Sequence, residues 1–220
     1  MASLTADDRG AARFPALSAG HYRVTASLDG RAASAETHID GQTTLDLRLP
    51  DNPALRVRAL DAVSSLPLPM ISARVISARG ETAIRNDVPG ADGVFQLPSF
   101  AAQPMTVVLS ARGYALKTLR GVMALDTPAT AFMTAGFRSF TVQVSGTVQP
   151  CSFEVRDLSG APIALSLDFN PGPVPLSVRN AVFYGMEAGQ YSATLHDCSG
   201  KTFSHPMRLA PGLTPDVRFP

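Results

Sequence analysis

The sequence has little charge, no tryptophan and no long apolar segment. Charged residues make up 17% of its 220 residues, and 19 Lys and Arg nearly balance 18 Asp and Glu, for a net charge of +1. Nucleic-acid-binding proteins usually carry a basic patch that matches the phosphates, so this balance argues against that class. No apolar run approaches the roughly 18 residues of a membrane-spanning helix. The first residues, MASLTADDRGAARF, also lack the basic region and apolar stretch of a secretory signal.

Motifs for catalysis or metal binding are equally scarce. The histidines at 21, 38, 196 and 205 form no H-x-H or H-x-x-x-H pair, and there is no C-x-x-C pair to suggest zinc. The sequence has no G-x-S-x-G nucleophile motif and no glycine-rich phosphate loop. Cys198 follows His196 by two positions, but side chains two apart on a strand do not make the oriented hydrogen bond that activates a thiol. We therefore predict no enzymatic activity, no cofactor and no metal.

Turn-forming residues are abundant, with 18 prolines and 17 glycines spread along the chain. Turns this frequent favour short strands over long helices. Between them, apolar and polar residues alternate, as in ALRVRALD at 54–61 and SFTVQVSG at 139–146. Alternation places one row of side chains inward and the next outward, which is typical of a strand covered on one face.

One order of strands recurs along the chain, which is the kind of repeat that decides a fold. Aligning the turn glycines Gly30, Gly113 and Gly200 superimposes YRVTASLDG, MTVVLSARG and YSATLHDCSG, with one extra residue in the last. Only the second and third copies contain the upstream half, in which SARVISARGETAI matches SFEVRDLSGAPIAL. Each copy closes in another alternating segment: TTLDLRLP at 43–50, TPATAFMT at 127–134 and TPDVRFP at 214–220.

These repeats predict an all-β fold of tandem immunoglobulin-like or prealbumin-like antiparallel β-sandwiches. The expected domains are a partial module over 1–49, which has only the C-terminal half of the pattern, and complete modules over 50–136 and 137–220. A half-module buries too little apolar surface and leaves an unpaired edge. Three explanations are open. The chain is a fragment of a longer protein; the half-module leans on the second module or gains a strand from residues 1–13; or a partner or second copy supplies the missing strands by strand addition.

The order of motifs resembles the transthyretin-like, carboxypeptidase-regulatory type of β-sandwich. DLSGAPI at 157–163 matches the D-x-x-G-x-P turn of its first half, and FPALSAGHYRVTASLDG at 14–30 matches its second half and is similar to the PEGA-type surface repeat. The resemblance implies non-catalytic modules of surface, secreted or secretion-apparatus proteins. We therefore expect a spacer and protein-interaction array of a larger extracytoplasmic bacterial protein. The alternatives are a carbohydrate-binding accessory region of a hydrolase and a cargo-recruitment adaptor of a bacterial or phage injection apparatus.

The chain has two cysteines, Cys151 just before the strand SFEVRD and Cys198 at the end of YSATLHD. In an immunoglobulin-like order these strands are antiparallel neighbours, so the start of one meets the end of the other. We predict a disulfide between them, worth about 4 kcal/mol in the chain-entropy estimate, which requires an oxidising compartment. The alternative is a pair of neighbouring buried thiols.

Three predicted loops are more apolar than turns usually are: PLPMI at 67–71, PSFAAQPM at 98–105 and NPGPVPLSV at 170–178. Exposed apolar patches often mark contacts, so we expect these loops either to bind a protein partner or to pack one module against the next. Carbohydrate is a second possible partner, although a sugar-binding platform would normally show exposed tryptophan or tyrosine, and this chain has no tryptophan. The candidate contact residues are Pro69, Met70, Phe100, Met105, Val174 and Leu176.

Overall fold

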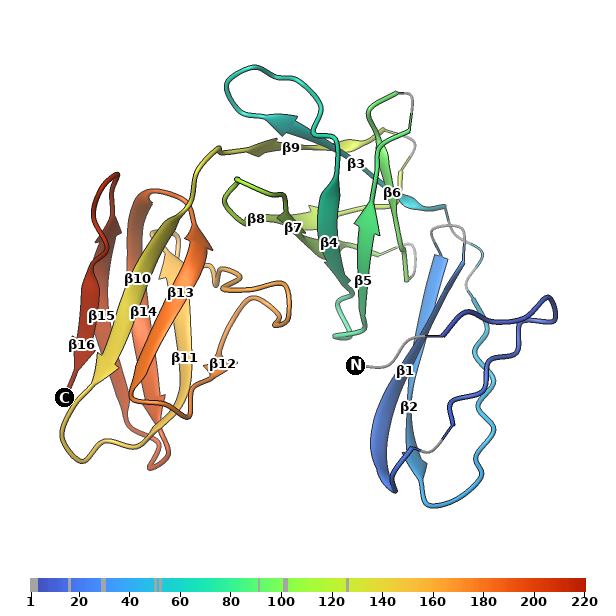
Figure 1. Ribbon diagram of the computed structural model, residues 1–220, viewed down its shortest axis with the longest axis horizontal. Helices are drawn as coiled ribbons and strands as arrows, with labels where there is room; N and C mark the ends of the chain where they lie inside the picture. The colour runs from blue at the N-terminus through green and yellow to red at the C-terminus, as the bar shows by residue number, and fades with distance from the viewer. Residues whose placement is uncertain are drawn as a thin grey trace.

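The computed structural model describes residues 4–15, 17–28, 31–49, 51, 53–90, 92–100, 103–125 and 127–220. All regular secondary structure in these ranges is β-strand, which confirms the all-β prediction (Figure 1). A two-stranded sheet is followed by two sandwiches, each made of a three-stranded and a four-stranded sheet. We call β3–β9 the middle sandwich and β10–β16 the C-terminal sandwich. The described ranges contain no helix of the length and apolarity that a membrane span requires.

In the middle sandwich, the order β6-β3-β9 in one sheet faces the order β5-β4-β7-β8 in the other. Neighbouring strands are antiparallel except β3 and β9, which run parallel because the last strand returns beside the first in the same direction. The seven strands are β3 (Leu55–Asp61), β4 (Ile71–Ile76), β5 (Thr82–Asp87), β6 (Phe95–Leu97), β7 (Met105–Ser110), β8 (Lys117–Val122) and β9 (Ala129–Met133).

The C-terminal sandwich repeats this plan, with the order β13-β10-β16 facing the order β12-β11-β14-β15. Its first and last strands, β10 and β16, are again a parallel pair. Alternation of residues predicts strands but not the direction of their neighbours, so sequence alone did not indicate these two pairs. The strands are β10 (Arg138–Val144), β11 (Pro150–Asp157), β12 (Val174–Pro175), β13 (Asn180–Met186), β14 (Gly189–Asp197), β15 (Thr202–Leu209) and β16 (Asp216–Phe219).

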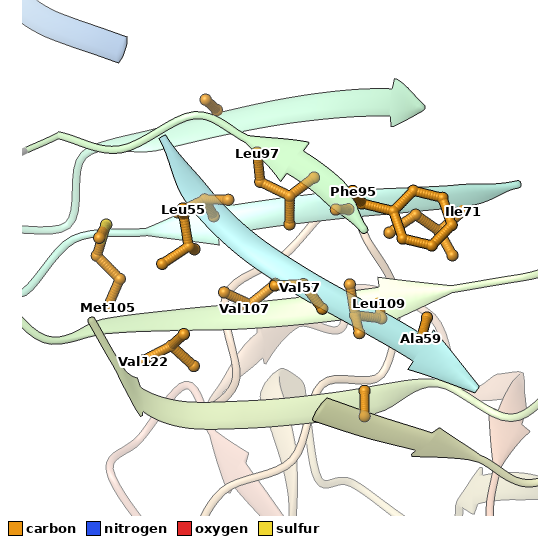
Figure 2. Packing of buried hydrophobic residues seen from close by; sticks show 14 of the residues in the cluster. Leu55, Val57, Ala59, Ile71, Phe95, Leu97, Met105, Val107, Leu109 and Val122 are labelled. Atoms are coloured by element: carbon orange, nitrogen blue, oxygen red, sulfur yellow. The ribbon is translucent and has the colours of Figure 1, made fainter. Parts of the chain in front are cut away.

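Each sandwich encloses a core built from the inward rows that alternation predicts. In β3, Leu55, Val57 and Ala59 are fully buried, and Figure 2 shows them facing side chains of β7 such as Val107 and Leu109. Burying each such side chain contributes about 1.5–3 kcal/mol, so these rows, repeated on every strand, hold the two sheets together.

Aromatic rings fill the corresponding space in the C-terminal sandwich. Phe183 stacks on Phe140 and on Phe153, with ring centroids 5.2 and 5.1 Å apart. Phe219 of the last strand meets Phe153 edge-on. Offset and edge-on contacts are the favoured arrangements of aromatic pairs, so four strands from both sheets are joined through this one cluster.

The partial module appears as a hairpin of β1 (Gly20–Leu28) and β2 (Arg31–Ile39) that leans on the middle sandwich. Ala32 is fully buried in the middle core, and its N–H donates to the Ser99 carbonyl oxygen at 2.8 Å. In β1, the Arg23 guanidinium donates to the Gly80 carbonyl oxygen at 3.0 Å. The Thr25 hydroxyl donates to the Thr82 carbonyl oxygen at 3.3 Å. These contacts agree with one of the three explanations given above, in which the half-module leans on the second module.

The closing segment TTLDLRLP was expected to form a strand, but residues 43–49 form none, and Pro50 lies outside the described residues. The aligned turn glycine Gly30 also lies outside them. The closing strands of the two sandwiches, β9 and β16, each pair with the first strand of their own sandwich. The first copy has no such upstream strand, so the alternating pattern at 43–49 finds no ladder to join.

Candidate interaction surfaces

Cys151 and Cys198 form the predicted disulfide, with Cα atoms 5.0 Å apart. Pro150 of β11 pairs with Asp197 of β14 beside it, so the bond joins two neighbouring antiparallel strands. Cys198 is therefore unavailable to His196 as a nucleophile. The bridge ties the beginning of one strand to the end of another, where the ladder would otherwise fray.

The predicted contact residues fall into two groups. Pro69 and Met70 are exposed, as expected for a surface loop, and their binding to a partner stays a prediction. The other four are at most 6% exposed and lie in the two cores: Phe100, Met105, Val174 and Leu176. Their assignment to an exposed surface is wrong, because Met105 and Val174 begin strands and point inward, while Phe100 and Leu176 pack into the cores from beside the strands. Ala101 and Ala102 of the same loop lie outside the described residues.

The two sandwiches meet through a loop that interrupts an edge strand. After β11, Pro162 makes a single bridge to Arg156, and the chain pairs with β11 again only at β12. The intervening residues 163–173, which we call the joint loop, extend toward the middle sandwich (Figure 1). The second copy has a continuous strand, β5, at the aligned position. A break in the repeat is therefore what makes the contact possible.

Apolar side chains form the centre of this contact. Ala164 and Leu167 of the joint loop pack with Ile76 of β4 and Val108 of β7. Val108 lies between two core residues of β7 and so points to the outer face, yet it is fully buried. An outward valine would be exposed if the C-terminal sandwich moved away, and keeping it buried favours the closed contact by about 1.5–3 kcal/mol.

Arg74, also on the outer face of β4, holds the joint loop by its polar groups. Its guanidinium donates to the carbonyl oxygens of Leu167 and Asp168, both at 3.0 Å, and to the Asn170 side-chain oxygen at 3.1 Å. Burial lowers the pKa of Arg74 from its usual value, while the nearby Asp168 carboxylate opposes that shift. A planar guanidinium with several fixed donors suits three acceptors in one loop.

A second set of contacts joins the residues around the start of β8 to the end of β13 and the turn that follows it. The Leu116 N–H donates to the Gly185 carbonyl oxygen at 2.7 Å, and Lys117 pairs with Glu187 at 3.3 Å. The Thr134 hydroxyl also donates to Glu187, at 3.1 Å. Gly185 has φ +91°, and a Cβ there would lie 3.2 Å from Leu116 side-chain atoms. This close approach of backbones therefore requires glycine.

A cleft of about 180 Å³ remains between these contacts. The charged side chains that line it are Lys117, Arg120, Asp157 and Glu187. Tyr191 also lines the cleft, and its hydroxyl donates to the Glu187 carbonyl oxygen at 3.0 Å. Burial raises the pKa of Tyr191 to about 12. Hydrogen bonding from Ser159 lowers the pKa of Asp157, and backbone N–H groups and Arg120 act in the same direction. Each charge in the cleft thus has a partner, and within the described ranges no three His, Cys, Asp or Glu side chains are grouped as metal ligands.

A polar cluster on the outer face of the C-terminal sandwich was missed by the sequence analysis. Glu154 is 5% exposed although it points away from the core, and Arg156 donates two hydrogen bonds to it at 3.0 and 3.1 Å. His196 Nε2 lies 3.7 Å from the same carboxylate. The E-V-R triplet at 154–156 was the available signal, because residues two apart on a strand share a face. The cluster pairs a buried carboxylate with a partly exposed guanidinium, and it contains no nucleophile.

No protein-family model matches this chain, and no curated protein matches it. Among solved structures, it is similar to the Bacillus anthracis TIE protein at 14% identity and a TM-score of 0.29, covering 97% of this chain and 43% of that one. A streptococcal ancillary pilin is similar at 16% identity and a TM-score of 0.29, covering 92% of this chain and 75% of the pilin. A shaft pilin of Lactobacillus rhamnosus GG is similar at 9% identity and a TM-score of 0.29, covering 76% of this chain and 96% of the pilin.

This chain therefore spans less than half of the TIE protein chain. Superpositions this loose define no activity or partner. What the structure itself establishes is the class: tandem β-sandwiches of the broad immunoglobulin-like type. The finer resemblance to transthyretin-like or carboxypeptidase-regulatory modules is not confirmed by any family match.

Proposed function

We propose that this chain is a non-catalytic module array of a larger protein, in which two β-sandwiches form a stiff spacer that also offers protein-binding surfaces. The observation that carries the proposal is the set of contacts between the two sandwiches, which we call the joint. Arg74 binds three acceptors of the joint loop, and the Leu116–Gly185 hydrogen bond adds a second link, made by other segments of the two sandwiches. Domains linked by few contacts move relative to one another by default, whereas several separate contacts between two sandwiches restrict that motion.

The connection between the sandwiches supports the same proposal. Four residues, 134–137, separate β9 from β10. Ala115 donates to the Thr134 carbonyl oxygen at 3.0 Å, and Gly136 donates to that of Gly113 at 2.7 Å. A short linker bonded along its length allows little bending. We propose the division into modules 1–49, 50–136 and 137–220, with the hairpin of the first module as a side layer of the second.

The disulfide supports an extracytoplasmic location, at the cell surface, in the periplasm or outside the cell, because structural disulfides persist in oxidising compartments. The absence of an enzymatic function stays part of the proposal. Carbohydrate binding and a role as an injection-apparatus adaptor stay predictions, because no contact among the described residues favours either.

The proposal is tested by measuring the distance between the sandwiches in solution. Spin labels at V63C and L213C, both highly exposed, should give one narrow distance distribution by double electron–electron resonance. Arg74→Ala removes three hydrogen bonds of the joint and should broaden it. Arg112→Ala, an exposed arginine of the same sandwich, is the matched control and should not. A distribution that is already broad with Arg74 in place would contradict the stiff spacer.

A further inference from the structure

The strand β13 has one side of its backbone unpaired. It is the outer strand of the sheet β13-β10-β16. The Val144 N–H donates to the Arg179 carbonyl oxygen at 2.8 Å just before β13 begins, which fixes the phase of the ladder because hydrogen-bonded and non-hydrogen-bonded pairs alternate. In this register, the N–H and C=O groups of Asn180 and Val182 point away from β10, and the register shifts only beyond Phe183. Asn180 and Val182 therefore each present a backbone donor and acceptor on the open side.

This edge lacks charge and proline, two of the devices that protect exposed edges against strand pairing. Proteins also shield edges with short strands and β-bulges, and the register shift of β13 lies at its end, beyond Phe183. Among the described edge strands of six or more residues, β13 (NAVFYGM) is the one without a charge or a proline. The protecting residues of the other long edges include Arg23 in β1, Glu36 in β2, Arg85 in β5, Lys117 in β8 and Pro206 in β15.

The side chains of β13 match a strand-like partner on both faces. Val182 and Tyr184 are 47% and 60% exposed on the outer face. On the inner face, Ala181 and Phe183 are only partly covered by the core. The open stretch ends at Gly185, whose carbonyl oxygen already accepts from Leu116 of the middle sandwich. Residues 180–184 are therefore the segment available for pairing, with Val182 at its centre.

We propose that β13 pairs antiparallel with β13 of a second copy of this chain, with a two-fold axis beside Val182. In this register Val182 faces the partner's Val182, and Asn180 faces the partner's Tyr184. The outward-pointing backbone groups of both strands then satisfy one another as hydrogen-bonded pairs. On the inner face, the small Ala181 faces the partner's large Phe183, so the two strands fill space in a complementary way.

A second copy fits this edge because the segment complements itself. The central valine meets its own equivalent, and the amide and phenol side chains at either end meet each other across the axis. No charge in the segment calls for a charged partner. A two-fold contact of this kind uses each edge once and closes, so it forms a dimer and no fibre. The product is one continuous sheet, β16-β10-β13 from each copy.

The first test measures association of the full chain by sedimentation velocity from about 1 μM to about 1 mM. The chain should shift from monomer to dimer within this range. Val182→Lys places two positive charges against each other at the axis and should weaken dimerisation at least tenfold. Val88→Lys, the same substitution at a 63% exposed valine after β5, should dimerise like the unaltered chain. A chain that stays monomeric throughout, or a V182K variant that dimerises equally well, would overturn the proposal.

A second test examines the register itself. Facing hydrogen-bonded residues have Cα atoms about 5.5 Å apart, which a disulfide can span, so V182C should form a covalent dimer under mild oxidation. Two copies of Y184C would lie about 13 Å apart along the strands and should not cross-link. Equal cross-linking of both variants would refute this register. Protection of the β13 amides from hydrogen exchange only in the presence of a different protein would assign the edge to that protein and refute the second-copy proposal.

Discussion

The disulfide makes a quantitative prediction about the C-terminal sandwich. Cys151 and Cys198 are 47 positions apart, and in the chain-entropy estimate closing a loop of this length stabilises the folded state by about 4 kcal/mol. Replacing both cysteines by serine removes the constraint and changes little else, because Cys151 and Cys198 are both exposed. A loss of this size is a large part of the 5–15 kcal/mol by which whole domains are typically stable.

The assay is differential scanning calorimetry, since the chain has no tryptophan to report unfolding by fluorescence. For a sandwich of this size, a loss of about 4 kcal/mol lowers Tm by roughly 15–30 °C. The unaltered chain treated with a thiol reductant is the control, and it should unfold at the same temperature as Cys151→Ser with Cys198→Ser. A decrease of only a few degrees in both samples would refute the reasoning, because the loop would then restrict the unfolded chain far less than its length implies.

Two further predictions concern the joint. Gly185→Ala should destabilise the C-terminal sandwich by about 1–3 kcal/mol, because alanine is strained at φ +91°, and it should also broaden the inter-sandwich distance distribution by pushing Leu116 away. Gly160→Ala, at φ +81° in an open turn, is the control that carries the same strain without the contact. For Tyr191, whose pKa rises to about 12, the unfolded chain loses the phenol proton near pH 10 while the folded chain keeps it. The free energy of unfolding should therefore fall between pH 10 and 12, and Tyr191→Phe should reduce that fall in urea titrations followed by circular dichroism.

The sequence predicted the strands well where one face of a strand meets a core. The alternation in ALRVRALD alone places Leu55, Val57 and Ala59 inward, and all three are buried. The disulfide was also predictable, because a strand order together with two cysteine positions determines which strand ends meet. Both inferences depend on local patterns combined with a single rule of sheet geometry.

The joint was beyond sequence reasoning because it depends on a departure from the repeat. The alignment of copies places the residues after Gly160 level with β5 of the second copy, but in the structure β11 is followed by the joint loop. Nothing in the sequence singles out the outward residues Arg74 and Val108, since alternation says nothing about what covers an outer face. The same limit explains the buried Glu154 and the mistaken exposure of Phe100 and Leu176.

The joint loop gives the array a fixed order. Its apolar residues and its acceptors for Arg74 fit the outer face of β4 and β7. The equivalent strands of the C-terminal sandwich carry Glu154, which is bonded to Arg156, and Thr194, which is bonded to Ser204. The outer face of β11 and β14 therefore offers no matching contacts to the joint loop of a further C-terminal sandwich. A duplicated or exchanged sandwich would therefore lack these contacts at the new junction unless the outer-face residues were changed with it.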